Sequence, residues 1–216
     1  MTYVKTFSPP PICRKEILRY AGVKGEASDI QRLLEECLQE AESKLIYRVC
    51  WELVPVSQNN GALDFVFAQT TSRDLAKNLK ECERAILFAA TVGPQLDMLI
   101  ARYSRISPAK ALLFNAIGAE RIESLCDLFC NEQKAQGLCL RPRFSPGYGD
   151  LPLSFQKDIF RVLDCPGKIG LTLNKSLIMS PSKSVTAFIG IGKQVCDQSV
   201  SCAACKKQDC AYRRSE

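Results

Sequence analysis

Residues 143–150, RFSPGYGD, place an arginine, a tyrosine and an aspartate around a Pro-Gly pair. Proline presets one backbone angle and glycine accepts a positive φ, so Pro146-Gly147 predicts a tight turn. A turn folds its flanking residues toward each other, so Arg143 and Tyr148 could face one small ligand. A guanidinium fork suits a carboxylate, and an aromatic face suits a base or a cation. The segment is therefore either a plain surface turn or a ligand-binding loop.

A second group with chemical potential is the set of cysteines in residues 193–216, namely Cys196, Cys202, Cys205 and Cys210. A Cys-x-x-Cys flanked by two further cysteines, in a segment too short for an apolar core, is typical of a thiolate metal site. Four thiolates suit zinc or an iron–sulfur cluster, and the spacing matches neither common ferredoxin pattern. The alternative is a reduced tail that binds no metal.

The composition limits the remaining chemistry. The 216 residues include no histidine, which excludes a histidine-based triad and a mixed Cys/His zinc site. Carboxylates, thiolates or a cofactor must then carry any reaction. The net charge of +6 is spread along the chain, with a small cluster only near residues 206–214, so we expect no nucleic-acid interface.

The distribution of apolar residues indicates a globular protein that we expect in the cytoplasm, with no membrane contact. The N-terminal stretch MTYVKTFSPPP lacks the apolar centre of a signal peptide, and no apolar run is long enough to span a bilayer. The expected division is a domain over 1–192 and a Cys-rich metal-binding tail over 193–216. The other eight cysteines are expected to be reduced thiols, mostly filling the core: Cys13, Cys37, Cys50, Cys82, Cys126, Cys130, Cys139 and Cys165.

Periodicity predicts the elements that must position the loop. Helices are expected over 28–45, 72–82, 94–105, 107–137 and 154–163, with Ser107 as a side-chain cap and Pro108 at the first helical position. Strands are expected over 47–56, 62–68, 84–93, 138–144, 176–180 and 185–191, the first two forming a β-hairpin through SQNNG. The mixed order predicts an α+β fold with a largely antiparallel sheet.

On the long predicted helix, Leu112, Ala116, Ala119 and Glu123 fall in one row. A carboxylate that continues a row of small apolar residues is partly buried and needs a cation or donors nearby. The simplest interpretation is a boundary glutamate paired with a surface lysine or arginine. A ligand contact is the alternative.

The segment 143–190 resembles the activation domain of cobalamin-dependent methionine synthase. The resemblance rests on an Arg-x-x-Pro-Gly-Tyr motif, a helix with a Leu-Asp-like turn, a Gly-x-x-Leu and a Ser-x-x-Met-x-Pro-x-x-Ser-Val. The matching residues are Arg143, Pro146, Gly147, Tyr148, Leu163, Gly170, Leu173, Ser176, Met179, Pro181, Ser184 and Val185. Two features of that family have no match here: an acidic residue near the N-terminus, and a tyrosine pair after Phe188.

The resemblance implies a curved α+β domain that binds S-adenosylmethionine in its concavity. By the same resemblance, Arg143 would bind the methionine carboxylate, Ser145 would contact the adenosine through its backbone, Tyr148 would line the site, and Glu123 would meet the positively charged end. The methyl group would go to a cobalamin held by a partner, a methionine synthase or related corrinoid methyltransferase.

In this reading the protein is a stand-alone reactivation component of an enzyme system. That role also calls for a low-potential electron donor, which favours iron–sulfur over zinc in the tail. The alternative is a redox or docking module for a corrinoid protein that does not itself bind S-adenosylmethionine.

Overall fold

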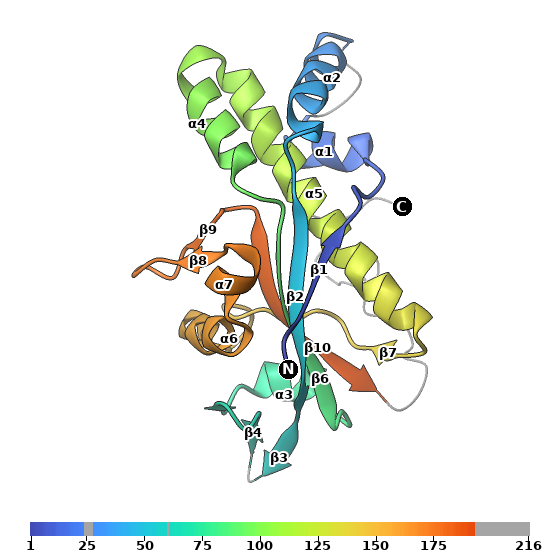
Figure 1. The fold of residues 1–216 in the computed structure, drawn as a ribbon, viewed down its shortest axis with the longest axis vertical. Helices are drawn as coiled ribbons and strands as arrows, with labels where there is room; N and C mark the ends of the chain where they lie inside the picture. The colour runs from blue at the N-terminus through green and yellow to red at the C-terminus, as the bar shows by residue number, and fades with distance from the viewer. Residues whose placement is uncertain (24–27, 60, 193–216) are drawn as a thin grey trace.

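A curled, five-stranded antiparallel sheet forms the centre of the molecule (Figure 1). The computed structural model describes residues 1–23, 28–59 and 61–192. Across the sheet the strands follow the order β1-β2-β6-β10-β7. Their bounds are β1 (Tyr3–Phe7), β2 (Tyr47–Pro55), β6 (Arg84–Thr91), β10 (Ser184–Gly192) and β7 (Cys139–Leu140).

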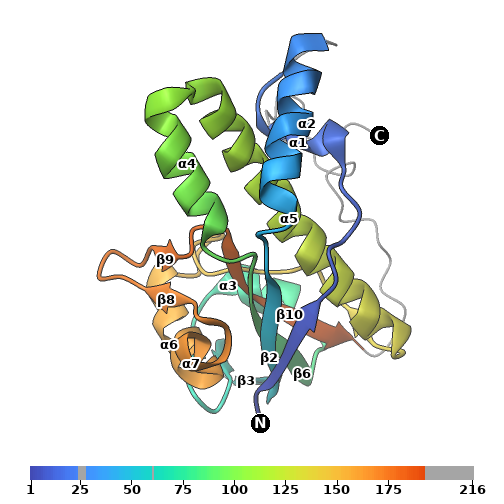
Figure 2. The same ribbon diagram turned by 45° about the horizontal axis from the view of Figure 1, so that its top comes forward.

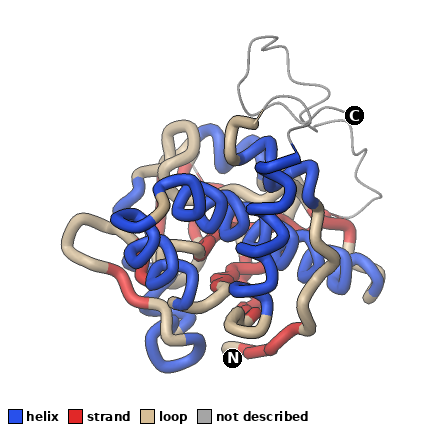
Figure 3. The backbone as a smooth tube through the Cα atoms, turned by 90° about the horizontal axis from the view of Figure 1, so that it is seen from above, coloured by secondary structure: helices blue, strands red, loops and turns tan. Residues whose placement is uncertain are grey.

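Helices cover both faces of this sheet (Figures 1 and 2). One face packs against α1 (Arg14–Tyr20), α2 (Ser28–Glu42), α4 (Gln95–Ile106) and α5 (Pro108–Ala135). The other packs against α3 (Arg73–Asn78), α6 (Gln156–Leu163) and α7 (Cys165–Ile169). From above, the helices of the described chain lie over and around the strands (Figure 3). The expected α+β class with a largely antiparallel sheet is confirmed.

The central strand β6 shows why the sheet has two cores. Ile86 and Phe88 belong to the cluster under α5, whereas Leu87 and Ala89 belong to the cluster under α6. Successive side chains of a strand point to opposite faces, so a strand covered on both sides must be apolar throughout. This accounts for the continuous apolar run that predicted a strand over 84–93.

Helix α5 spans 28 residues and lies across the sheet between α4 and α1 (Figure 2). Pro108 occupies its first turn, as predicted, but the Ser107 side chain makes no capping hydrogen bond, so the predicted side-chain cap is wrong. At Gly118 the helix makes room for Lys183, because a Cβ there would lie 2.7 Å from the lysine stem. The Lys183 ammonium donates to Asn115 Oδ1 at 2.6 Å.

The predicted hairpin of 47–56 with 62–68 is confirmed only in part. Residues 62–64 pair antiparallel with 57–59, on either side of the predicted turn, but 47–56 is not the partner strand. Strand β2 pairs with β1 on one side and β6 on the other, so both of its edges are already occupied. A smaller sheet follows instead, made of β3 (Ser57–Asn59), β4 (Ala62–Asp64) and β5 (Gln69–Thr70). Phe65 leaves that sheet for the core, and Val66 adopts a positive φ of 70°.

Several short elements differ from the sequence expectation. The strand expected over 138–144 is reduced to β7 and one bridge at Phe144, because Pro142 has no N–H to donate. The strand expected over 176–180 is reduced to β9 (Met179–Ser180), which pairs with β8 (Thr172–Leu173). Helix α6 is preceded by a short 3₁₀ turn, η1 (Leu153–Phe155).

The cysteines of the described chain are mostly core residues, as expected. Five are buried: Cys37, Cys50, Cys82, Cys126 and Cys165. Cys130 and Cys139 are half-buried, and Cys13 is exposed, so the core interpretation is wrong for Cys13. Burial raises the pKa of the Cys37 thiol to about 11, which keeps it protonated at neutral pH.

Candidate ligand site beside the long helix

The position of Arg143 is fixed by the residue that follows it. Phe144 exchanges two backbone hydrogen bonds with Phe188 of β10, at 2.9 and 2.8 Å. The Phe144 side chain packs into the cluster under α6. Because neighbouring side chains in an extended segment point to opposite faces, Arg143 is directed toward α5.

On α5, the Arg143 guanidinium meets two carboxylates one helical turn apart. Its Nη2 donates to Glu123 Oε2 at 2.7 Å, and its Nη1 donates to Asp127 Oδ1 at 2.6 Å. Nη1 also lies 3.9 Å from Cys130 Sγ. The exposed fractions of the side chains are 23% for Arg143, 37% for Glu123 and 48% for Asp127. In this cluster the arginine is therefore more buried than the two carboxylates, which are partly open to solvent.

The electrostatics of this cluster favour a permanently charged arginine. Burial acts to lower the pKa of Arg143, but the acidic groups around it, Glu123 and Asp127 among them, outweigh burial and raise that pKa above its ordinary value. Two carboxylates against one guanidinium give the cluster a formal charge of −1. On the same helix, burial raises the pKa of the Cys126 thiol, so this thiol remains neutral.

The loop after Arg143 contains the predicted turn. Tyr148 N donates to Ser145 O at 3.1 Å across Pro146 and Gly147, and Gly147 has a φ of 89°. Tyr148 is 60% exposed, and its ring lies edge-on to Phe144 with centroids 6.2 Å apart. Within the described chain no hydrogen bond joins Tyr148 to Arg143. The structure thus brings Arg143 and Glu123 into contact and leaves the phenol beside Phe144.

The far end of the loop is fastened to α3 by Asp150. Its carboxylate accepts hydrogen bonds from the Ser72 hydroxyl, from Arg73 N at 2.7 Å and from Asp74 N at 3.2 Å. The Ser72 hydroxyl bond and the backbone N–H of Arg73 hold the pKa of Asp150 below its usual range. Gly149 lies so close to Asp74 that a side chain there would collide with it. Asp150 is therefore a structural anchor of the loop.

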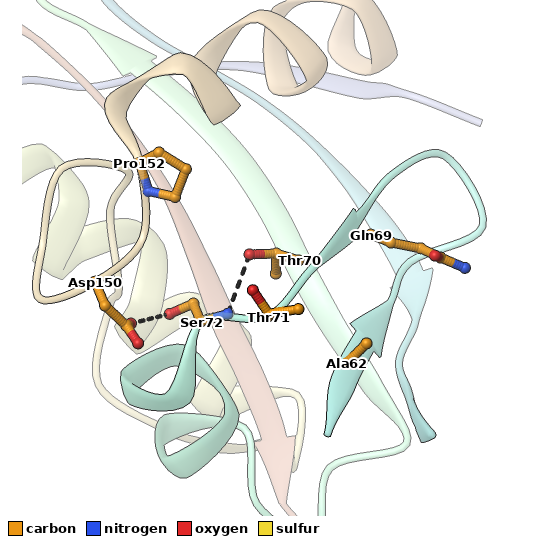
Figure 4. Close-up of a pocket in the computed structure, with 7 residues that line it drawn as sticks. All are labelled: Ala62, Gln69, Thr70, Thr71, Ser72, Asp150 and Pro152. Atoms are coloured by element: carbon orange, nitrogen blue, oxygen red, sulfur yellow. Dashed lines mark hydrogen bonds between the residues drawn. The ribbon is translucent and has the colours of Figure 1, made fainter. Parts of the chain in front are cut away.

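Beside this anchor lies an open pocket of about 490 Å³ (Figure 4). It is lined by Ala62, Gln69, Thr70, Thr71, Ser72, Asp150 and Pro152. Thr70 Oγ1 accepts from Ser72 N at 3.3 Å, and the Ser72 hydroxyl donates to Asp150, so these three lining residues bond to one another. Asp150 alone among these lining residues carries a charge. The pocket offers hydroxyl and amide groups and no ion pair.

A second arginine–carboxylate cluster on α5 is fully internal. Arg121 and Glu120 are 2% and 3% exposed and form a direct ion pair. Arg121 also donates to the carbonyls of Pro10 and Pro11 at 2.6 and 2.7 Å, while Glu120 accepts from Cys13 N at 3.0 Å. These bonds fasten the N-terminal segment to α5.

The proposed metal ligands Cys196, Cys202, Cys205 and Cys210 lie outside the described residues. Over the described ranges, no three His, Cys, Asp or Glu side chains are grouped so as to hold a metal ion. In the same part of the chain, no helix has the length and apolar character to cross a membrane.

Comparison with known proteins identifies the fold. No protein-family model and no curated protein sequence matches the chain. Among solved structures, the chain is similar to the MetH reactivation domain, crystallised with AdoHcy bound. The match has a TM-score of 0.61 and 15% sequence identity, and it covers 88% of this chain and 78% of that one. The protein therefore has a fold like that of a methionine synthase reactivation domain.

Asp127, the second carboxylate that binds Arg143, was not predicted from the sequence. A signal was present, because residues four apart on a helix share a face and Asp127 follows Glu123 by four. Glu120 and Arg121 were also overlooked. Their partners in residues 10–13 lie more than 100 positions away, and no local pattern reveals such contacts.

Proposed function

We propose that the protein binds S-adenosylmethionine or its demethylated product beside residues 143–148, and so supports reductive remethylation of a corrinoid. The observation that carries this proposal is the contact between Arg143 and Glu123, 2.7 Å apart and partly open to solvent. It occurs in a fold similar to a domain crystallised with AdoHcy. A guanidinium beside a carboxylate matches the carboxylate and ammonium of an amino acid.

Each residue has a role in this proposal. Arg143 holds the ligand carboxylate, Glu123 faces the ammonium or sulfonium, and the backbone at Ser145 contacts the adenosine. The exposed ring of Tyr148 offers a face to the adenine. These groups align the ligand and limit access of water.

The partner is a methionine synthase or a related corrinoid methyltransferase. Its cobalamin, when bound, supplies the nucleophile that accepts the methyl group. Transfer of a methyl group from a sulfonium requires no proton transfer, which is compatible with a chain without histidine. The chain would act as one component of that enzyme system, together with a low-potential electron donor.

Calorimetric titration with S-adenosylmethionine and S-adenosylhomocysteine tests the binding step. Wild-type protein should bind, and Arg143→Ala should weaken binding about tenfold or more, because it removes a charge-assisted hydrogen bond. The control is Glu132→Gln, since Glu132 is a half-exposed α5 carboxylate that pairs with Lys5 outside the site. Absence of binding by the wild type, or equal binding by Arg143→Ala, would refute the proposal.

The corrinoid step is tested with an inactive, oxidised methionine synthase, a low-potential reductant and S-adenosylmethionine. Adding the protein should increase the rate at which the methylcobalamin spectrum appears, and Arg143→Ala should reduce that increase. Equal rates with and without the protein would refute the role in remethylation and would leave nucleoside binding as the supported activity.

The cysteines of residues 193–216 support a second function, a redox or docking module for a corrinoid protein. The supporting observation is the grouping of Cys196, Cys202, Cys205 and Cys210 in 24 residues at the end of the chain. Iron and acid-labile sulfide with a visible charge-transfer band would support an iron–sulfur cluster. Colourless protein with stoichiometric zinc would exclude the cluster, and metal-free protein would exclude both.

A further inference from the structure

Both terminal nitrogens of Arg143 are occupied by the chain itself. Nη2 donates to Glu123 and Nη1 donates to Asp127, at 2.7 and 2.6 Å. A carboxylate from a ligand therefore meets an arginine fork that already holds two carboxylates. Each terminal nitrogen carries two N–H groups, so a ligand carboxylate can still reach the fork. Three carboxylates around one guanidinium repel one another, however, and release of one of the chain's own carboxylates relieves that repulsion.

Asp127 is the partner that can leave with least cost. Its side chain is 48% exposed, against 37% for Glu123, so water can solvate its carboxylate after release. Among the described residues, each of the two carboxylates has Arg143 as its sole hydrogen-bond or ion-pair partner, so exposure is what distinguishes them. Glu123 and Asp127 are like charges four residues apart on α5, so their mutual repulsion also favours release of one.

We propose that Asp127 is an internal competitor for the ligand carboxylate: it occupies Nη1 of Arg143 in the free protein, is displaced on binding, and thereby sets ligand affinity. This inference rests on the proposed function. The cluster carries a formal charge of −1. A ligand that has a carboxylate but no cationic group would make that charge −2. A zwitterion leaves it unchanged and brings a cation for Glu123. The site therefore selects a zwitterionic amino-acid group over a simple carboxylate.

The test is calorimetric titration of S-adenosylhomocysteine into wild type and Asp127→Asn. The amino-acid group of this ligand has no net charge, so removing one charge from the site leaves the long-range attraction nearly unchanged. Loss of the competitor should tighten binding about two- to fivefold, the range expected for a partly exposed ion pair. Glu132→Gln, which removes a carboxylate elsewhere on α5, should bind like the wild type.

Two further measurements separate competition from a general change in structure. In an Arg143→Ala background, Asp127→Asn should have no effect, because the competitor acts only through the guanidinium. Methylthioadenosine, which lacks the carboxylate, should bind wild type and Asp127→Asn equally. A gain for both ligands, or a gain that persists without Arg143, would overturn the inference.

The outcomes distinguish this inference from the function on which it rests. If wild type binds through Arg143 but Asp127→Asn binds equally or more weakly, Asp127 is not a competitor and the proposed function stands. If neither protein binds any S-adenosyl compound, both proposals fail. Thermal unfolding of each variant confirms that it is folded under the titration conditions.

Discussion

Helix α5 carries two arginine–carboxylate clusters made of the same kinds of side chain, and they differ in their access to water. In the first, Arg121 and Glu120 are 2% and 3% exposed. In the second, Arg143 is 23% exposed and its partners Glu123 and Asp127 are 37% and 48% exposed. The two clusters begin three residues apart along the helix, yet they meet different surroundings.

The difference shows how burial assigns a role to an ion pair. A buried charge must have every partner supplied by the chain, and Arg121 obtains them from Glu120 and the carbonyls of Pro10 and Pro11. A partly exposed charge can exchange a protein partner for water or a ligand at little cost. The first cluster is therefore structural, and the second is suited to binding.

The largest expected effect is on the buried cluster. Arg121→Met leaves the Glu120 carboxylate buried without its cation, and it also leaves two proline carbonyls unbonded. We expect a loss of about 3–5 kcal/mol in the free energy of unfolding, measured in urea. A loss of stability no larger than that of a substitution at Arg143 would contradict the distinction between the two clusters.

A double substitution, Glu120→Leu with Arg121→Met, sharpens this result. It removes both charges together, so the penalty for an unpaired carboxylate disappears. The backbone groups of Pro10, Pro11 and Cys13 still lose their partners. The double variant should therefore recover only part of the lost stability, and a full recovery would show that the backbone bonds contribute little.

A smaller effect is expected at the open cluster. Arg143→Met should reduce the free energy of unfolding by about 1 kcal/mol, because Glu123 and Asp127 can be solvated once the guanidinium is gone. Its effect on ligand binding should be larger than its effect on folding. A loss of stability equal to that of Arg121→Met would mean that the open cluster is structural too.

Asp150 tests an intermediate case, an exposed carboxylate whose partners all come from the chain. Its folded-state pKa is lowered, so its contribution to stability is present above its unfolded pKa of about 3.9 and is lost as the pH falls through the lower folded value. Wild type should be more stable than Asp150→Asn at pH 6. In urea titrations the two curves should converge once the pH falls below the folded-state pKa of Asp150, and a gap that persists after protonation would contradict the assignment.

The smallest expected effect concerns salt. In about 1 M NaCl the Debye length falls to about 3 Å, which screens exposed charges far more than buried ones. The stability difference between wild type and Arg143→Met should shrink in salt, while the difference for Arg121→Met should persist. Urea unfolding at low and high salt provides the measurement, and equal shrinkage for both variants would remove the distinction.

The fold elements that sequence predicted well are those whose patterns are local. Helices α2 and α5 and strands β6 and β10 have long apolar runs or periodic faces, and the structure contains all four. Strand β1 was not predicted, because four of its five residues are exposed and it forms by pairing with β2, which begins 40 residues later. The turn of the expected hairpin was placed correctly, between β3 and β4, but 47–56 is not its first strand, because β1 and β6 occupy both edges of β2.

The candidate site was only partly predictable. The Pro-Gly turn follows from backbone chemistry, and the contact of Arg143 with Glu123 follows the expectation that a half-buried glutamate needs a cation. Asp150 could not be assigned as an anchor, because its partners Ser72 and Arg73 lie more than 70 residues earlier in the chain. The roles of Ser145 and Tyr148, and the metal site of the tail, stay predictions.

The order of strands in the sheet has a consequence for biosynthesis. Strand β10 is the last strand of the described chain, yet it lies between β6 and β7 and bonds to both. Until Ser184–Gly192 has been synthesised, β6 has one unpaired edge and Arg143 has no strand to anchor Phe144 beside it. A nascent chain that ends before residue 184 should therefore depend on chaperones and be vulnerable to proteases, and ligand binding should appear only when the final strand has inserted.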